Sequence, residues 1–255
     1  MRRKLNVIFL VAAVLLGAGC RTWHTQEPSF QDKRLTEWLK DYALFSYWTP
    51  EFEEDGTPID WTPPFTKEDR EVGKKAQQAL QRIGTNAIPT LLRMLVTMER
   101  PDWQLAPAGF NALGHAARPV VPTLVAMLET NYVVASAALE AIGPSAVEAT
   151  PALLKQASLT NGADALFALR ALGQIHGMPE LVVPFLRDQL ESCSKDTRNA
   201  YAAANYIQAL AHYGEQAKEA IPDIQLFFTV EQKDLRASAT NALRQINNDN
   251  NRRAR

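Results

Sequence analysis

The stretch Ala138-Leu139-Glu140-Ala141-Ile142-Gly143-Pro144-Ser145-Ala146-Val147-Glu148-Ala149-Thr150-Pro151-Ala152-Leu153-Leu154 carries the pattern that decides the fold. An apolar run ends at a glycine, a more polar stretch and a proline follow, and a second apolar run begins. Glycine takes the left-handed conformation that ends many helices, and proline fits the first turn of the next helix. The stretch therefore predicts a helix, a turn and a second helix.

The same pattern returns along the chain. Ala/Leu-rich runs end at five glycines that are 30, 29, 30 and 41 residues apart, namely Gly84, Gly114, Gly143, Gly173 and Gly214. A period of this size indicates stacked helical hairpins, because one hairpin alone does not bury both of its apolar stripes. We expect the second helices near residues 88–98, 120–129, 148–157, 180–191 and 219–229.

Details differ between the repeats. Thr66-Lys67-Glu68-Asp69 has the spacing of a capping box, so the first helix is expected to begin there. Pro107 and Gly109 fall inside the first helix of the second repeat and are expected to kink it or delay its start. In the fourth repeat Pro184 stands eleven residues after Gly173, so this repeat has the longest connection.

These Ala-Leu-x-x-Ile/Leu-Gly helix ends and Ala-x-x-Ala-x-Pro-x-Leu-style openings resemble a HEAT-repeat protein of the short, phycobilisome-lyase-like type. The best matching segments are residues 143–154 and 214–224, and the resemblance covers roughly residues 67–247, with residues 234–246 as a last, unpaired helix. It implies an all-α fold, a right-handed α-solenoid (superhelix) of about five HEAT-like helical hairpins. Such an array offers an extended surface for binding.

Residues 20–66 differ from the repeats in being rich in aromatic side chains. Leu35, Trp38, Leu39 and Tyr42 follow helical spacing, which predicts a helix over about 33–46. We expect this region to be a tether followed by a cap on the first hairpin, since the end of a repeat array needs a cover. An aromatic platform for a ligand or partner is the alternative.

Residues 1–19 have the organisation of a secretory signal peptide. Arg2, Arg3 and Lys4 precede an apolar run over 5–16, and Leu16-Gly17-Ala18-Gly19-Cys20 ends the segment. The last five residues resemble a bacterial lipobox, which implies lipidation of Cys20 and a lipid-anchored, periplasm-facing place in the cell envelope. By the same resemblance, the absence of aspartate at position 21 favours the outer over the inner membrane. An ordinary signal peptide with an incidental cysteine is the alternative.

Charge argues against a nucleic-acid partner. Removal of residues 1–19 leaves 24 basic and 28 acidic residues, so no strong field of either sign remains. Three arginines near the C-terminus stand in a polar segment, residues 248–255, that we expect to be a disordered tail. They lack the clustering that nucleic-acid binding needs.

The sequence predicts no catalytic residue, metal or cofactor. Its four histidines lack the spacing of a helical metal site, and phosphate-loop, nucleophile-elbow and dinucleotide motifs are missing from it. The acidic residues 51–55 lack a recognisable cation-binding pattern, so a solvated turn is favoured over a calcium site. Cys193 is the one thiol left once Cys20 is lipidated, which excludes an intramolecular disulfide.

The function that follows is a non-catalytic protein-binding scaffold or adaptor, with no enzyme activity. The second helices of HEAT-like stacks usually line the concave face, which gives five candidate contact residues, Arg93, Glu129, Lys155, Arg187 and Lys218. A solvated face is the plain alternative for them. Two other functions stay open: a chromophore lyase-like enzyme, because some members of the resembled family attach or detach bilins, and a ligand-sensing or envelope-structural module.

Overall fold

The structure is a computed structural model that describes residues 27–46, 66–97, 102–159, 165–195 and 200–253. The described chain is all-α, as the sequence predicts, apart from the two-residue strands β1 (Ser29–Phe30) and β2 (Lys33–Arg34), which pair antiparallel. The predicted signal peptide with Cys20, most of the tether and the acidic residues 51–55 lie outside the described residues.

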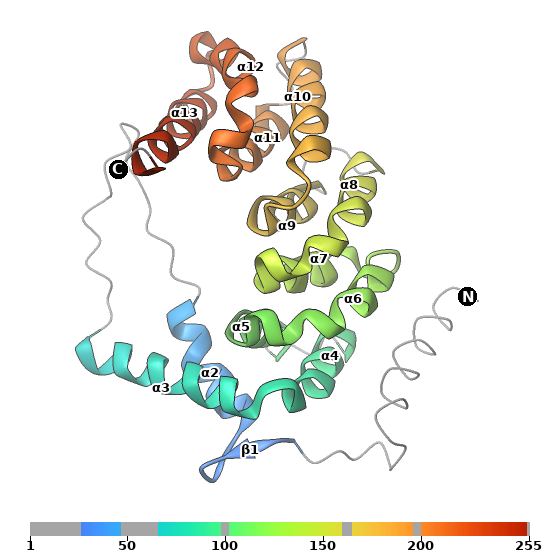
Figure 1. Ribbon diagram of the computed structural model, residues 1–255, viewed down its shortest axis with the longest axis vertical. Coiled ribbons are helices and arrows are strands. Elements are labelled where there is room, and N and C mark those ends of the chain that lie inside the picture. The colour runs from blue at the N-terminus through green and yellow to red at the C-terminus, as the bar shows by residue number, and fades with distance from the viewer. Residues whose placement is uncertain (1–26, 47–65, 98–101, 160–164, 196–199, 254–255) are drawn as a thin grey trace. The chain divides into compact units, whose positions relative to one another are not determined.

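The described residues fall into two compact units, 27–149 and 150–253. In the first unit the helices are α2 (Leu35–Ser46), α3 (Lys67–Ile83), α4 (Ile88–Thr97), α5 (Asp102–Leu113), α6 (Val121–Met127) and α7 (Tyr132–Ile142), with the 3-10 turns η1 (Gly84–Ala87), η2 (Gly114–Val120) and η3 (Gly143–Ala149). In the second they are α8 (Thr150–Leu159), α9 (Leu166–Ile175), α10 (Pro179–Lys195), α11 (Ala200–His212), α12 (Ile221–Gln225) and α13 (Lys233–Arg253), with η6 (Gly214–Ala220) and η7 (Leu226–Thr229). Figure 1 shows these elements by label and colour.

The capping box predicted at the start of the first repeat is confirmed. The Thr66 hydroxyl accepts a hydrogen bond from the Asp69 amide at 3.2 Å, and the Asp69 carboxylate accepts one from the Thr66 amide at 2.8 Å. These two bonds satisfy amides that the first turn of a helix leaves without partners. The bonds from Thr66 also lower the pKa of the Asp69 carboxyl. Helix α3 therefore begins at Lys67.

The turns between paired helices share one design that the sequence shows only in part. In η2, η3 and η6 the residues three and six positions after the glycine are apolar and at most 2% exposed, and a proline follows at position eight. They are Ala117 and Val120, Ala146 and Ala149, and Ala217 and Ala220. A 3-10 helix has three residues per turn, so positions three apart lie on one side of it. Each turn thus buries one edge, and its other edges are partly or fully exposed.

The glycine that opens each turn has a backbone conformation that other residues avoid. Gly84, Gly114, Gly143 and Gly214 all have positive φ, between 51° and 66°. At Gly143 φ is 66° and ψ is −140°, close to a region that only glycine populates readily. The prediction that glycines end these first helices is confirmed at the four positions.

The fifth glycine, Gly173, does not end its helix, so the prediction is wrong there. Helix α9 continues to Ile175, and His176 takes the left-handed conformation instead, with φ of 53°. Gly173 is buried within α9, where a Cβ atom would lie 3.0 Å from the ring of His212. The glycine serves a close approach of α9 and α11 rather than a turn.

The second repeat keeps a continuous first helix. Helix α5 runs from Asp102 through Pro107 and Gly109 to Leu113, so the expected delay of its start is not observed. A Cβ atom at Gly109 would lie 2.5 Å from a methyl carbon of Leu91 and 2.9 Å from one of Leu39. This glycine therefore lets α5 pack closely against both α4 and α2.

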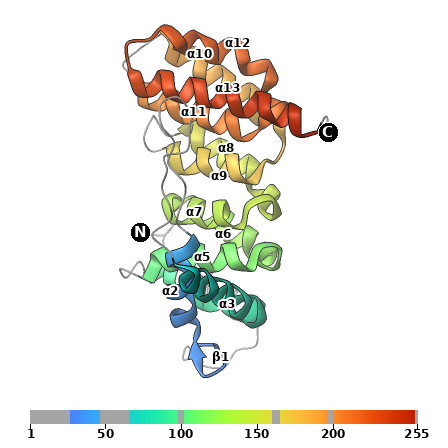
Figure 2. The ribbon, with the colours of Figure 1, turned by 90° about the vertical axis from the view of Figure 1, so that its left-hand side faces the viewer.

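Helix α2 packs beside α3 and α5 (Figure 2). Its side chains Leu35 and Leu39 are fully buried. Tyr42 is 5% exposed and its hydroxyl donates a 2.7 Å hydrogen bond to the Asn111 side-chain oxygen on α5. Burial of these three side chains stabilises α2 against the repeats.

Trp38 takes a different place from the other residues of its predicted stripe. It is half-buried, and its indole N–H donates a 3.1 Å hydrogen bond to the Phe30 carbonyl oxygen on β1. The Lys33 ammonium lies 4.3 Å from the centre of the indole ring, a cation–π contact. Trp38 thus packs on the short β-hairpin, and Tyr42 alone of the two aromatic residues docks on the repeats.

Helix α10 begins at Pro179, close to the expected start near residue 180, with Pro184 inside it, and it continues to Lys195, past the expected end near residue 191. Helix α13 continues to Arg253, beyond the expected end at Ile246, so the segment predicted as a disordered tail is helical up to that residue. A helix is compatible with the polar residues there, because the helix propensity of such residues is less than about 1 kcal/mol below that of alanine.

We expect replacement of Gly143 by valine to destabilise the protein by about 1–3 kcal/mol, because a β-branched residue is strained at this φ and ψ. Urea denaturation midpoints measure the effect. Pro144→Val is the matched control, since position 144 is exposed and adjacent and its φ is not positive. Equal midpoints for the two variants would contradict the role assigned to Gly143.

Candidate functional site

Three of the five predicted contact residues present solvent-exposed side chains. Arg93 lies on α4, Glu129 follows the end of α6, and Lys155 lies on α8, and all three are exposed. Within the described residues, no hydrogen bond or ion pair joins two of the five predicted residues to each other. Arg93 and Glu129 are thus surface residues of the first unit, and Lys155 is a surface residue of the second.

The other two predicted residues take part in ion pairs. The Arg187 guanidinium on α10 lies 2.6 Å from the Asp223 carboxylate on α12 and 3.5 Å from the Glu219 carboxylate in η6. Lys218 pairs with Glu215 at 2.6 Å within η6. Arg187 thus ties α10 to the next turn and helix, which is a structural use of its charge. A partly exposed pair of this kind contributes about 1 kcal/mol or less.

The first unit has a comparable pair between successive turns. The Arg118 guanidinium in η2 bonds the Glu148 carboxylate in η3, with 3.0 Å between Arg118 Nε and the oxygen. Beside it, the Ser145 hydroxyl lies 3.4 Å from His115 Nδ1. Thr85, His115, Ala116, Arg118, Pro119, Pro122 and Glu148 line an open depression of about 550 Å³ on this face.

The Ser145–His115 contact does not have the geometry of an activated nucleophile. Its 3.4 Å length is at the long limit of a hydrogen bond, and His115 is exposed to water. A nucleophile–base pair usually lies within about 2.6–3.2 Å, with the base oriented by a third group. We therefore treat the pair as part of the contact between η2 and η3.

In the second unit two histidines and a tyrosine meet where α9 ends. The ring centres of His176 and His212 are 6.2 Å apart, and the Tyr213 ring lies edge-on to His176 at 5.8 Å. The Tyr213 hydroxyl lies 3.1 Å from the Leu172 carbonyl oxygen and 3.0 Å from that of Gly177. Burial, and next the charge of Glu180, raise the pKa of this hydroxyl. Tyr213 thereby holds the end of α9 against α11.

His212 is held in its neutral form by its surroundings. Burial is the main cause of its lowered pKa, followed by the charges of His176 and Arg170. A neutral imidazole packed beside Gly173 fits a structural role at the α9–α11 contact. The described residues hold no group of three or more His, Cys, Asp or Glu side chains placed to bind a metal ion.

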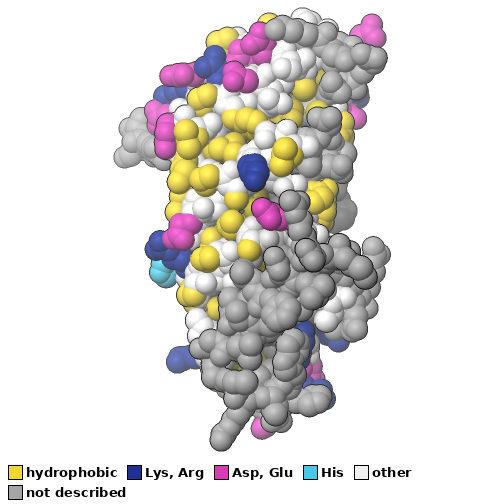
Figure 3. All heavy atoms as spheres, turned by 90° about the vertical axis from the view of Figure 1, so that its right-hand side faces the viewer, with side chains coloured by type: hydrophobic (Ala, Val, Ile, Leu, Met, Phe, Trp, Pro, Cys, Tyr) yellow, Lys and Arg dark blue, Asp and Glu magenta, His cyan; other side chains and the backbone are white. Residues whose placement is uncertain are grey.

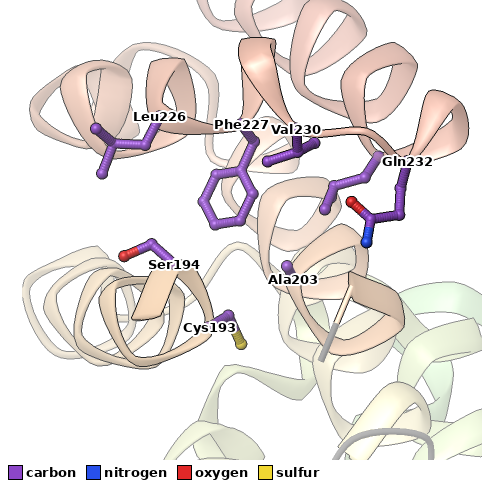
Figure 4. Close-up of a pocket in the computed structure, with 8 residues that line it drawn as sticks. Cys193, Ser194, Ala203, Leu226, Phe227, Val230 and Gln232 are labelled. Atoms are coloured by element: carbon purple, nitrogen blue, oxygen red, sulfur yellow. The ribbon is translucent and has the colours of Figure 1, made fainter. Parts of the chain in front are cut away.

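A cavity of about 250 Å³ lies in the second unit between α10, α11, η7 and the start of α13 (Figure 4). Its lining residues are Cys193, Ser194, Ala203, Leu226, Phe227, Val230, Gln232 and Leu235. Ala203, Phe227 and Leu235 are at most 4% exposed, Cys193 is 7% exposed, and Leu226 is 56% exposed. The cavity therefore has an apolar interior and reaches the surface near η7.

The described surface carries hydrophobic side chains among isolated charges rather than a strip of one charge. Figure 3 shows this mixture in one view of the surface. Large exposed hydrophobic residues in the second unit are Leu159, Leu181, Tyr201, Leu226 and Phe228. Within the described part of the chain, no helix is both long and apolar enough to cross a membrane.

Comparisons with protein-family models, with curated proteins and with solved structures found no match to this chain. The HEAT-repeat resemblance therefore stays a prediction. The sequence patterns also did not predict the cavity in the second unit. Its lining comes from positions 193–203 and 226–235, which carry no motif, although a single buried thiol and the irregular spacing of the fourth repeat both fall there.

We expect the free energy of unfolding to fall as the pH is lowered from about 7.5 to about 5.5, in part because of His212. Its pKa is below 6.5 in the folded protein, so the unfolded chain binds more protons in this range. Urea midpoints across the range measure the slope, and His212→Gln should flatten it. An unchanged slope in that variant would contradict the assignment, with His115→Gln, an exposed histidine, as the control.

Proposed function

We propose that this protein is a non-catalytic protein-binding scaffold or adaptor, built as a right-handed HEAT-like α-solenoid of about five hairpins with an aromatic-rich N-terminal cap. In this proposal a lipid on Cys20 holds it at the bacterial cell envelope, facing the periplasm and on the outer rather than the inner membrane. The signal-like segment and lipobox-like residues before Cys20 support the location.

The observation that carries the proposal is the repeated turn. A positive-φ glycine, buried apolar residues at positions three and six, and a proline at position eight recur in η2, η3 and η6. A chain that repeats one helix–turn–helix unit fixes the residues facing its neighbours and leaves the outer residues free for recognition. Binding of a protein partner is the function that such a surface serves most directly.

We propose that the second helices supply the contacts. Arg93 on α4 and Lys155 on α8 are exposed, as is Glu129 after α6, so their charges are accessible to a partner. Arg187 and Lys218 are less suited, because each already pairs with a carboxylate of the second unit. Exposed hydrophobic side chains on the same class of helix, such as Leu181 on α10, add area that a partner would bury.

The anchoring part of the proposal is tested by Cys20→Ser. We expect this variant to lose incorporation of labelled fatty acid and to leave the membrane fraction. The helical fold should persist, because position 20 precedes the described helices. Circular dichroism checks the fold. Equal lipid labelling of the variant and the native protein would remove the lipoprotein proposal.

The binding part is tested by photo-crosslinking in intact cells. A benzophenone amino acid placed at position 93 or 155, on second helices, should form discrete adducts with another protein. Lys75 on α3 and Arg244 on α13, both exposed and on other helices, are matched control positions. Protein adducts only from the second helices support the proposal. The same adducts from all four positions, glycan adducts alone or none at all would contradict it.

A further inference from the structure

We propose that the cavity between α10, α11, η7 and α13 is a binding site for a small hydrophobic molecule with one uncharged or outward-facing polar end. The site lies wholly within the second unit. It therefore does not depend on the protein-binding function proposed above.

The cavity is a hollow of about 250 Å³ that reaches from the surface near η7 toward three almost completely buried side chains, Ala203, Phe227 and Leu235. Apolar cavities of about 150 Å³ bind benzene, so a hollow of this volume has room for a small molecule.

The buried part of the cavity lining is apolar. The buried wall consists of Ala203, Phe227 and Leu235 together with the Cys193 side chain, which behaves as a small hydrophobic group. None of the eight lining residues is Asp, Glu, His, Lys or Arg, so a charge buried within the cavity would lack a counter-charge from these residue types. The bound part of the ligand is therefore neutral and apolar.

The two polar lining residues, Gln232 and Ser194, lie at the edge of the cavity. Gln232 is exposed and Ser194 is half-buried, and the Ser194 hydroxyl donates to the Glu191 carbonyl oxygen at 2.8 Å, which leaves its lone pairs as acceptors. In Figure 4 the Phe227 ring points toward Cys193, with Ser194 on one side of it and Gln232 on the other. An apolar interior with a few polar groups at the edge is the usual composition of a small-molecule site.

The cavity lies where the repeat is irregular. Helix α10 has 17 residues, whereas α4 and α8 have 10 each. Cys193 and Ser194 lie in the part of α10 beyond a ten-residue helix, so the longer helix supplies one wall. The other two second helices are shorter still, with 7 residues in α6 and 5 in α12, so α10 is the longest of the five described second helices.

The first test uses paired alanine-to-leucine variants. Ala203 borders the cavity, whereas Ala168 on α9 is equally buried but does not line it. Ala203→Leu should keep or raise the urea midpoint because the new side chain fills empty space, and Ala168→Leu should lower it by overpacking. A fall of the same size in both variants would show that no usable space exists at Ala203.

The second test measures binding through the thiol in the cavity wall. The full chain with Cys20→Ser keeps Cys193 as its one cysteine, and its reaction with methyl methanethiosulfonate reports access to the cavity. Octanoate and indole are the probes. Either should slow the reaction about tenfold at ten times its Kd, since a bound ligand covers the thiol. Ala203→Leu should abolish this protection.

Each outcome of the protection experiment either supports the proposed binding site or overturns it. Protection by octanoate alone assigns an acyl chain, protection by indole alone assigns an aromatic ring, and both results support the site. Absence of protection by both probes up to their solubility limits overturns it and leaves the cavity to a side chain of a protein partner. Equal protection in the Ala203→Leu variant also overturns it, because the probes would then bind elsewhere. These results are independent of the crosslinking outcome.

Discussion

A positive-φ glycine followed by a 3-10 turn is the constraint on which the hairpins of this protein depend. At Gly143 the backbone reverses direction at φ of 66° and ψ of −140°. The segment that follows bends at Ala146, with φ of −97° and ψ of 20°, and buries Ala146 and Ala149. Pro151 then lies in the first turn of α8. Recurrence of this arrangement at Gly114 and Gly214 gives both units the same local geometry.

Close approach between helices depends on small residues beyond the turns. Gly109 lets α5 lie against Leu91 and Leu39, and Gly173 makes room for the His212 ring. Larger residues at either position would need their neighbours to move. Ion pairs act on top of this packing. Two sets of ion pairs join consecutive elements at the surface: Arg118 with Glu148, and Arg187 with its two carboxylates. Each contributes little to stability but disfavours a slipped alignment of the elements that it joins.

The sequence predicted the elements whose causes are local. The capping box at Thr66 was found because its hydrogen bonds involve residues three apart, and four of the five glycine turns because glycine alone tolerates their φ. Errors arose where a distant contact decided the role of a residue. Gly173 follows the same Ala-Leu pattern as Gly143, yet it lies inside α9, and its lack of a side chain makes room for the ring of His212, 39 positions away.

The candidate sites were less predictable for the same reason. Charged residues at expected helix positions were easy to name, but the sequence does not show that Asp223 and Glu219 already neutralise Arg187. The cavity is formed by side chains from four separate elements, none of which carries a motif.

The location of the cavity nevertheless has a physical reason. A repeat array that keeps equal helix lengths packs without gaps, so extra turns at the end of one helix extend past the neighbours that would have covered it. In this chain α10 is that helix, and η7 with the start of α13 closes over its end without filling the space. Irregular repeats are therefore the places in such a fold where a function other than stacking is built.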